Sequence, residues 1–226
     1  MVRKVELSAS LISADHSRLM EDTVRLVKAG ADRIHCDISD GKLIRPLIFG
    51  PILIPVLNKV ASARVDLHFW LERPEFQLTE YLSMMDKTVI KTVYFPLETC
   101  LKPFSLVEDI KNAGFKPGVC ILPITPTSYA FPLLSYVEEI MVMTSDPTYE
   151  KRTTLPFTLG KIAELRKAID ENGYAAKIAV DGGIDQEFLP KVVGAGADVL
   201  VLGGIVFKQR MIEENIRQIR EIIAKI

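Results

Sequence analysis

Short apolar runs alternate with amphipathic segments along the chain. Runs rich in valine, isoleucine and leucine predict strands, and apolar residues at a 3.6-residue period predict helices. We expect strands at residues 5–11, 33–38, 64–70, 88–95, 117–122, 138–144, 177–181 and 198–202. We expect helices at residues 17–28, 51–61, 74–85, 103–113, 158–171, 185–195 and 211–225, and a further helical segment from Pro126 to about residue 136. The pattern is therefore eight strands and eight helices in strict alternation.

Some of the expected strands, such as residues 140–144 and 199–202, are almost continuously apolar. Such runs are typical of parallel strands that are covered by helices on one side and fill a barrel on the other. Alternation of this kind in 226 residues predicts a single (β/α)₈ barrel domain over residues 1–226. The repeated Ala-Gly-Ala-Asp at residues 29–32 and 195–198 indicates related βα units. A doubly wound open sheet is the alternative, but no G-x-G-x-x-G follows the first strand.

Charge and composition argue against several classes of protein. The chain has 28 basic and 29 acidic residues and no basic run with interleaved aromatic residues, so we expect no nucleic-acid partner. It has no signal-peptide-like start, and no window approaches the roughly 20 apolar residues of a membrane span. We therefore expect a cytoplasmic protein without a membrane partner. Cys36, Cys100 and Cys120 form no C-x-x-C pair, which predicts reduced thiols.

Three of the expected strands end in histidine or aspartate. His35 and Asp37 end the second strand and share a face, because side chains alternate along a strand. His68 ends the third strand and Asp181 ends the seventh. Two imidazoles and two carboxylates suit divalent zinc, iron, manganese or cobalt better than magnesium or calcium, which prefer oxygen ligands. The sequence thus predicts one divalent metal ion held by these four residues.

Each of these residues also has a simpler explanation. A single inward-facing histidine is more often a hydrogen-bonded core residue than a ligand, and an Asp-Gly pair is usually a turn. Their coincidence favours the metal site, because two of the three histidines in the chain end strands beside carboxylates. Buried carboxylates that converge on a barrel mouth also need a counter-charge.

Glycine pairs follow the last two expected strands. Gly182-Gly183 comes after the seventh strand and Gly203-Gly204 after the eighth. In barrels of this type, the loops after these strands commonly bind phosphate through backbone N–H groups. A tight turn explains either pair alone equally well. Both pairs together, beside a metal site, favour a phosphorylated substrate.

Two aspartates around one metal predict a proton-transfer reaction. The metal would hold a carbonyl oxygen and stabilise the enediolate that forms when a proton leaves the neighbouring carbon. Asp37 and Asp181, on opposite sides of the mouth, would be the acid and base. Removing the proton from one face of the carbon and returning a proton on the other face inverts the configuration at that carbon, so we expect an epimerase.

Several further motifs occur in order between about residues 6 and 207. They are Ala9-Ser10-Leu11, Ala29-Gly-Ala-Asp32, His35-x-Asp37-x-x-Asp40-Gly41, Phe49-Gly-Pro51, Asp66-x-His68, Gly118-Val119, Pro123-x-Thr-Pro126, Met143-Thr144, Val180-Asp-Gly-Gly183 and Gly196-Ala-Asp198. Together they resemble the ribulose-phosphate 3-epimerase family. The resemblance implies a metal-dependent (β/α)₈ enzyme that interconverts ribulose 5-phosphate and xylulose 5-phosphate.

The same resemblance implies roles for individual residues. It places His35, Asp37, His68 and Asp181 on the metal ligands and the two aspartates on the acid/base pair. It also places Ser10 on a substrate-contacting serine. The substrate-binding residues expected from all these motifs are Ser10, His68, Met143, Gly182, Gly183, Gly203 and Gly204. The family is commonly a homo-oligomer, either a dimer or a hexamer, and we expect the same here.

The chain departs from the family pattern around the site. Ser39 replaces one methionine and Trp70 another, so Met143 is the one that remains of three methionines that usually cap the enediolate. Trp70 would narrow or reshape the substrate site if it lies at the mouth. A glycine-rich family loop corresponds here to residues 147–152, which contain Lys151 and Arg152. These two charges offer another way to bind phosphate, although a charge pair on a loop is more often only solvated.

The departures leave the expected catalytic residues in place and predict a shifted substrate. Ribulose 5-phosphate is the default, and allulose 6-phosphate or another ketose phosphate is the alternative within the same chemistry. A non-catalytic sugar-phosphate-binding barrel is the alternative of another class; the altered loop favours it and the four retained ligands disfavour it. Decarboxylating or formaldehyde-condensing relatives use Asp-x-Lys-x-x-Asp, where this chain has Ser39 and Lys42.

Overall fold

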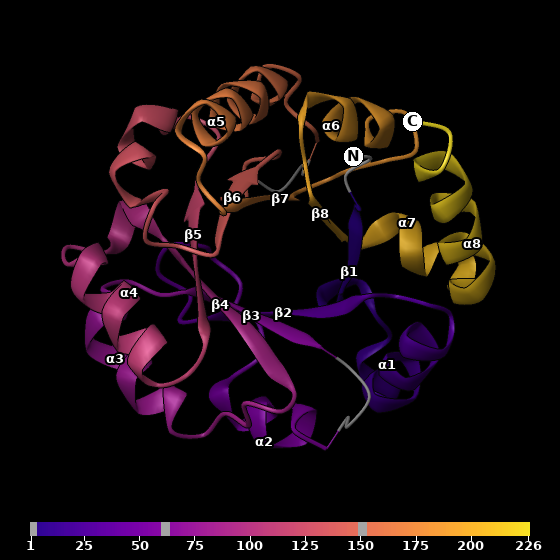
Figure 1. The fold of residues 1–226 in the computed structure, drawn as a ribbon. Coiled ribbons are helices and arrows are strands. Elements are labelled where there is room, and N and C mark those ends of the chain that lie inside the picture. Colours follow the sequence, from indigo (N-terminus) through magenta and orange to yellow (C-terminus); the bar gives the residue numbers. More distant parts are fainter. Residues whose placement is uncertain (1–3, 60–63, 149–152) are drawn as a thin grey trace.

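Eight parallel strands close into a barrel in the computed structural model, which describes residues 4–59, 64–148 and 153–226. The strands are β1 (Glu6–Ser10), β2 (Arg33–Ser39), β3 (Val65–Trp70), β4 (Ile90–Pro96), β5 (Lys116–Ile121), β6 (Glu139–Met143), β7 (Lys177–Asp181) and β8 (Val199–Leu202). Each strand pairs with its neighbours in the sequence, and β8 pairs with β1 (Figure 1). The (β/α)₈ barrel is therefore confirmed, and the open doubly wound sheet is excluded. That residues 1–226 form one domain stays a prediction.

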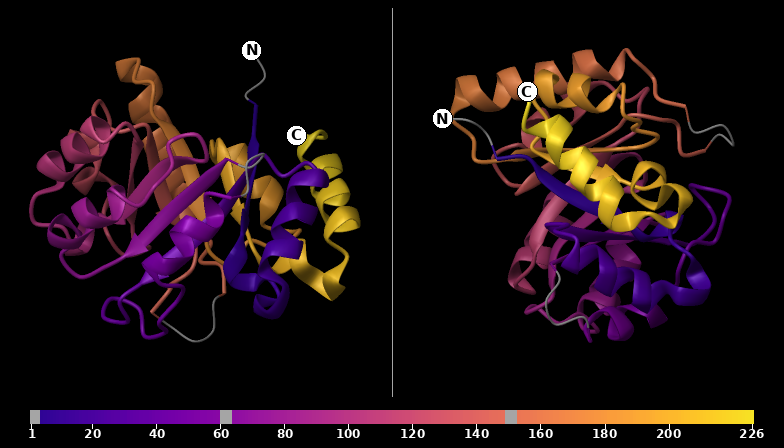
Figure 2. Two further views of the ribbon diagram at one scale, coloured as in Figure 1. Left: turned by 90° about the horizontal axis from the view of Figure 1, so that it is seen from below. Right: turned by 90° about the vertical axis from the view of Figure 1, so that its right-hand side faces the viewer.

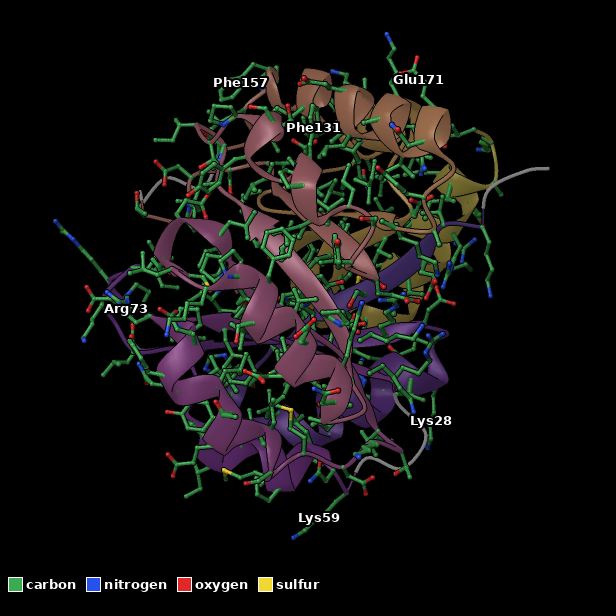
Figure 3. The ribbon with its side chains drawn as sticks, turned by 60° about the vertical axis from the view of Figure 1, so that its left-hand side comes forward. Lys28, Lys59, Arg73, Phe131, Phe157 and Glu171 are labelled. Atoms are coloured by element: carbon green, nitrogen blue, oxygen red, sulfur yellow. The ribbon has the colours of Figure 1, made fainter. Side chains whose placement is uncertain are left out.

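Helices surround the barrel on its outer side (Figure 1). They are α1 (Leu19–Lys28), α2 (Ile54–Leu57), α3 (Pro74–Leu82), α4 (Pro103–Asn112), α5 (Thr158–Asn172), α6 (Leu189–Ala195), α7 (Gly204–Phe207) and α8 (Ile212–Ile223). The side chains of Lys28, Lys59 and Glu171 point away from the barrel into solvent (Figure 3). Within the described ranges, no helix combines the length and the apolar character needed to cross a membrane.

The helical layer differs from the prediction between β5 and β6. Residues 126–136 were expected to form a helix, but they contain two 3₁₀ turns, Thr127–Tyr129 and Phe131–Leu133. Pro126 and Pro132 explain the difference, because proline has no amide hydrogen to donate and disfavours the helical conformation of the residue before it.

The helices beside β2 and β8 also differ from the prediction. α2 has only four residues and follows a 3₁₀ turn at Pro51–Leu53, and Pro55 in its first turn lacks the amide hydrogen that would continue the turn as an α-helix. The short helix α7 after β8 was not expected. One change shortens the helical layer and the other adds a short helix to it, and both leave the barrel closed.

The strands separate two cores because their side chains alternate in direction. In β2, the apolar Ile34, Cys36 and Ile38 pack in the large cluster beneath the helices. Arg33 instead reaches across the interior of the barrel, where its Nη1 donates to Glu139 of β6 at 2.8 Å. His35 and Asp37 share the inward face of the strand with Arg33 and are buried.

The two Ala-Gly-Ala-Asp repeats form the same local structure. The carboxylate of Asp32 accepts the amide hydrogen of Leu7 in the preceding strand, and the carboxylate of Asp198 accepts that of Ile178, each at 2.8 Å. Both aspartates also form an ion pair with an arginine from an outer helix. The repeat therefore ties the start of one strand to the start of the strand before it.

The C-terminus and the candidate site lie at opposite ends of the barrel. Figure 2 shows the start of β1 and the C-terminus on the side where the strands begin, and the loop of residues 40–50 on the side where they end. Asp37, His68 and Asp181 belong to the second half of their strands, and His35 lies one residue before the middle of β2, on the same face as Asp37. Their side chains therefore gather toward this loop-covered mouth.

Candidate active site

The structure brings together the four side chains predicted as metal ligands. One ligand atom from each of His35, Asp37, His68 and Asp181 lies within 4.8 Å of the others. The parallel register produces this arrangement, because it sets Asp37 of β2 beside His68 of β3, while His35 lies two residues earlier on the same face. Asp181 ends β7 and approaches from the other side of the mouth. Residues 146 positions apart thus meet in one group.

The imidazoles of His35 and His68 are completely buried. The Nε2 atom of His35 lies 3.5 Å from Asp37 Oδ1 and 3.9 Å from Asp181 Oδ2, and His68 Nδ1 lies 3.5 Å from Asp37 Oδ1. Neither ring nitrogen of either histidine has a hydrogen-bond partner among the described residues. Buried polar atoms are normally satisfied, so these two histidines are not hydrogen-bonded core residues of the ordinary kind. The arrangement leaves room between nitrogen and oxygen atoms for a cation.

Burial and charge act in opposite directions on this group. Burial alone would lower the pKa of His35, but the adjacent Asp37 and Asp181 outweigh it and raise that pKa to about 9. At His68 burial prevails, and the pKa is lowered. Burial would raise the pKa of Asp37, but the two histidines hold it well below its usual range. Asp37 is therefore a carboxylate at neutral pH, which is the form that binds a cation.

Asp37 accepts two hydrogen bonds from neighbouring strands. The hydroxyl of Ser10, on β1, donates to Asp37 Oδ2 at 3.4 Å. The indole Nε1 of Trp70, on β3, donates to Asp37 Oδ1 at 2.9 Å. The sequence had singled out Ser10 as a substrate contact and Trp70 only as a wall of the pocket. The direct bond from Trp70 to Asp37 was missed, because the sequence does not say which way the indole nitrogen points.

A cavity of about 390 Å³ opens above the group. The predicted site residues that line it are Ser10, Asp37, Met143, Asp181, Gly182, Gly183, Gly203 and Gly204. His35 and His68 are not part of this lining, because they lie deeper in the barrel with no exposed surface. The predicted contact of His68 with substrate therefore stays a prediction.

Ser13 and Ser145 lie against two of the glycines in the wall of this cavity. A Cβ atom on Gly203 would lie 2.4 Å from the Ser13 hydroxyl oxygen, and one on Gly182 would lie 2.4 Å from that of Ser145. Gly182 also has a φ of +117°, which favours glycine. The sequence analysis did not select either serine. Ser13 follows β1 and Ser145 follows β6, and nothing in the sequence indicates that these loops touch the glycines after β8 and β7.

The charged residues in the described part of the cavity wall are Asp37, Asp181 and Asp185, which are all acidic. Lys151 and Arg152, which were considered as phosphate ligands, lie outside the described residues. In the part that the structure describes, the side-chain hydrogen-bond donors beside the glycine pairs are therefore the hydroxyls of Ser13 and Ser145, and the carboxylates of Asp181 and Asp185 flank Gly182 and Gly183.

Solved structures with similar folds are (β/α)₈ proteins of low sequence identity. A 3-hexulose-6-phosphate synthase from Salmonella typhimurium matches with a TM-score of 0.71 at 18% identity, covering 98% of this chain and 99% of that one. A tryptophan synthase alpha chain from Legionella pneumophila subsp. pneumophila matches with a TM-score of 0.68 at 13% identity, covering 99% and 93%. These likenesses support the fold and nothing more.

Sequence relatives are more specific. A ribulose-phosphate 3-epimerase from Methanocaldococcus jannaschii is 32% identical over 96% of this chain and 90% of its own length. A ribulose-phosphate 3-epimerase from Escherichia coli strain K12 is 30% identical over 97% of this chain and 96% of its own length. Residues 6–207 also match the sequence model of the ribulose-phosphate 3 epimerase family. The chain therefore belongs to the ribulose-phosphate 3-epimerase family of isomerases.

Proposed function

We propose that the chain catalyses the metal-dependent 3-epimerisation of a ketose phosphate, with ribulose 5-phosphate to xylulose 5-phosphate as the default reaction. The observation that carries this proposal is the meeting of His35, Asp37, His68 and Asp181 ligand atoms within 4.8 Å at the barrel mouth. Family membership supplies the reaction class, and the two aspartates in this group supply the acid and base that the class requires.

The residues present fit one divalent zinc, iron(II), manganese or cobalt ion. His35 and His68 offer buried nitrogen atoms without hydrogen-bond partners among the described residues, and Asp37 and Asp181 offer carboxylate oxygens. This mixed nitrogen and oxygen set matches borderline metals better than magnesium or calcium. When bound, such an ion would stabilise the negative charge that develops on the substrate oxygens.

The two aspartates would move the proton at C3. One carboxylate takes the C3 proton, and the electron pair of the broken C–H bond shifts to form an enediolate with the C2 carbonyl oxygen. The other aspartate starts protonated and gives its proton to C3 from the opposite face. Asp37 on β2 and Asp181 on β7 approach from different sides of the mouth, as two-face transfer requires. Each turnover exchanges their protonation states, so the reverse reaction uses the same pair.

We propose that the substrate lies in the cavity with its phosphate at the glycine pairs. Gly182, Gly183, Gly203 and Gly204 line this end, and their backbone can approach a ligand closely. The hydroxyls of Ser13 and Ser145 would add hydrogen bonds. Ser10 and Met143 also line the cavity and would contact the sugar.

The test is deuterium uptake from D₂O into C3 of candidate substrates, with zinc, iron(II), manganese or cobalt added. We expect uptake into ribulose 5-phosphate or into a hexulose phosphate such as allulose 6-phosphate, together with the epimer as product. Comparing pentulose and hexulose phosphates also decides the chain length. No uptake into any of them, with metal bound, would leave a non-catalytic sugar-phosphate-binding barrel as the better explanation.

The variant Asp181→Asn tests the acid/base role directly. It should lower kcat by about 10³-fold or more, because it removes a proton-transfer group, while metal content falls far less since an amide oxygen can still bind a cation. Metal analysis and C3 exchange on the same preparation give both quantities. Asp170→Asn, on the outer surface of α5, is the matched control and should keep wild-type exchange. Unchanged kcat in Asp181→Asn would remove Asp181 from the reaction.

Three further expectations stay proposals alongside this function. We propose a homo-oligomer, a dimer or a hexamer, as the family resemblance implies. We also propose a cytoplasmic protein without nucleic-acid or membrane partners, and a single barrel domain over residues 1–226. Light scattering of the purified chain would test the first, and limited proteolysis the last.

A further inference from the structure

Trp70, the only tryptophan of the chain, ends β3 in the wall of the cavity. Its side chain is almost completely buried and packs on the imidazole of His68, with ring centroids 4.1 Å apart and an angle of 39° between the rings. From this position its Nε1 donates the 2.9 Å hydrogen bond to Asp37 Oδ1. The indole thus touches one expected ligand with its face and another with its N–H group.

The two oxygens of Asp37 have different surroundings. Oδ1 accepts the indole hydrogen and lies 3.5 Å from both His35 Nε2 and His68 Nδ1. Oδ2 has a longer contact, 3.4 Å, with the Ser10 hydroxyl. Oδ1 therefore faces the imidazole nitrogens, while Oδ2 lies on the side of Ser10, which lines the cavity.

The chemistry of indole makes this bond directional. The indole N–H only donates, so its partner must be an acceptor, and a bond to an ionised carboxylate is stronger than one between neutral groups. Packing on His68 fixes the plane of the indole and hence the direction in which the N–H points. A phenylalanine or methionine at this position would fill space but would not hold a carboxylate oxygen.

We propose that Trp70 is a positioning residue that fixes the orientation of the Asp37 carboxylate and so gives its two oxygens different roles. Its N–H group holds Oδ1 beside the nitrogens of His35 and His68, so that Oδ2 is presented to the cavity as the oxygen that exchanges a proton with substrate. The role of Oδ2 rests on the proposed function, whereas the orientation of the carboxylate does not.

Replacement of Trp70 by 3-benzothienylalanine is the sharpest kinetic test. This analogue keeps the shape of the double ring and its packing on His68 but has sulfur in place of the N–H, and the single tryptophan makes the replacement specific. We expect kcat for C3 exchange to fall about tenfold or more with KM changed less than about twofold, because a misplaced base slows the chemical step more than binding. Trp70→Phe should show the same split. Wild-type kcat in the analogue would overturn the proposal and leave Trp70 as an apolar wall.

An NMR measurement tests the hydrogen bond without using activity. A ¹⁵N-labelled chain has one indole N–H cross-peak, because it has one tryptophan. We expect Asp37→Ala to move this peak upfield, since the donor loses its carboxylate. A peak that stays in place in Asp37→Ala would overturn the proposal.

The two arms separate the possible failures. If the wild type exchanges C3 of no ketose phosphate, the proposed function fails and the peak alone decides the orientation of Asp37. If exchange occurs but the indole peak has the same chemical shift in Asp37→Ala as in the wild type, the proposed function stands and the positioning role fails. Trp70→Met supplies a second variant for the kinetic arm if Trp70→Phe does not fold.

Discussion

The interior of the barrel holds two buried polar clusters that differ in how their charge is balanced. The base cluster, near the starts of the strands, consists of Glu6, Arg33, Asp66 and Glu139. Arg33 donates to Glu6 at 2.7 Å and to Glu139 at 2.8 Å, and lies 3.4 Å from Asp66. The protein thus supplies its own cation at this end.

The mouth cluster, near the ends of the strands, consists of His35, Asp37, His68 and Asp181. It also joins buried carboxylates to nitrogen groups, but its imidazole nitrogens lack hydrogen-bond partners among the described residues. Its geometry suits a cation that comes from outside. The chain therefore provides the cation at one end of the barrel, whereas the other end has nitrogens that are unpartnered in the described part of the chain, as the proposed metal site requires.

Tyr94 of β4 separates the two clusters. Its ring centroid lies 6.0 Å from that of His35 and 5.9 Å from that of His68, and its hydroxyl donates to Glu139. Gly118 makes space for this ring, because a Cβ atom there would lie 2.2 Å from it. The ring of Tyr94 thus contacts the histidines of the mouth cluster while its hydroxyl belongs to the hydrogen bonds of the base cluster. The comparison of the two clusters leads to three predictions.

Removing the cation of the base cluster should have the largest effect. Arg33→Met should lower the free energy of unfolding by about 3–5 kcal/mol, because it leaves the buried carboxylates of Asp66 and Glu139 without their ion-pair partner, although Glu6 keeps Lys177. Denaturant unfolding of the metal-free protein measures this quantity. Arg64→Met is the control; Arg64 is half exposed and lies 3.7 Å from Glu6, so its loss should cost less than about 1 kcal/mol. Equal losses in the two variants would show that the base cluster is not held by Arg33.

Adding a metal should stabilise the mouth cluster by a smaller amount. At a free metal concentration of 100 times Kd, the free energy of unfolding should rise by about 2.7 kcal/mol, and a chelator should reverse the gain. His68→Asn should lose this metal-dependent part, while Arg64→Met should keep it. A gain in the wild type that persists in His68→Asn would place the metal elsewhere.

The pH dependence of metal binding should give the smallest change in free energy of the three predictions. The pKa of His35 is raised to about 9, so below that pH its proton must leave before the nitrogen can bind a cation. Between pH 7 and 8.5, affinity for Mn²⁺ should rise about tenfold per pH unit, or about 1.4 kcal/mol. Calorimetry in two buffers of different ionisation enthalpy should find about one proton released per ion at pH 7. Binding without proton release would contradict a protonated His35.

Much of the barrel could be predicted because its local rules leave a trace in the sequence. The alternation of strand residues already put His35 and Asp37 on one face and Ile34 and Cys36 on the other. The helix expected after Pro126 was wrong because two prolines in that segment outweighed its apolar pattern. An apolar pattern alone is a weak guide to a helix where prolines remove the backbone amide donors that the helix needs.

Some contacts between side chains far apart in the chain could not be predicted from the sequence. Arg33 looked like the polar start of a strand, and its partner Glu139 is 106 residues away. The bond from Trp70 to Asp37 joins residues 33 positions apart and depends on the rotation of one ring.

By itself, the sequence determined the order of strands and helices and the set of polar residues at the strand ends, because both follow from periodicities of two and 3.6 residues within short segments. Only the tertiary structure decided which polar groups face each other inside the barrel and which carboxylate oxygen meets which donor. Those contacts depend on the register and closure of strands far apart in the chain, and on side-chain rotations that packing selects.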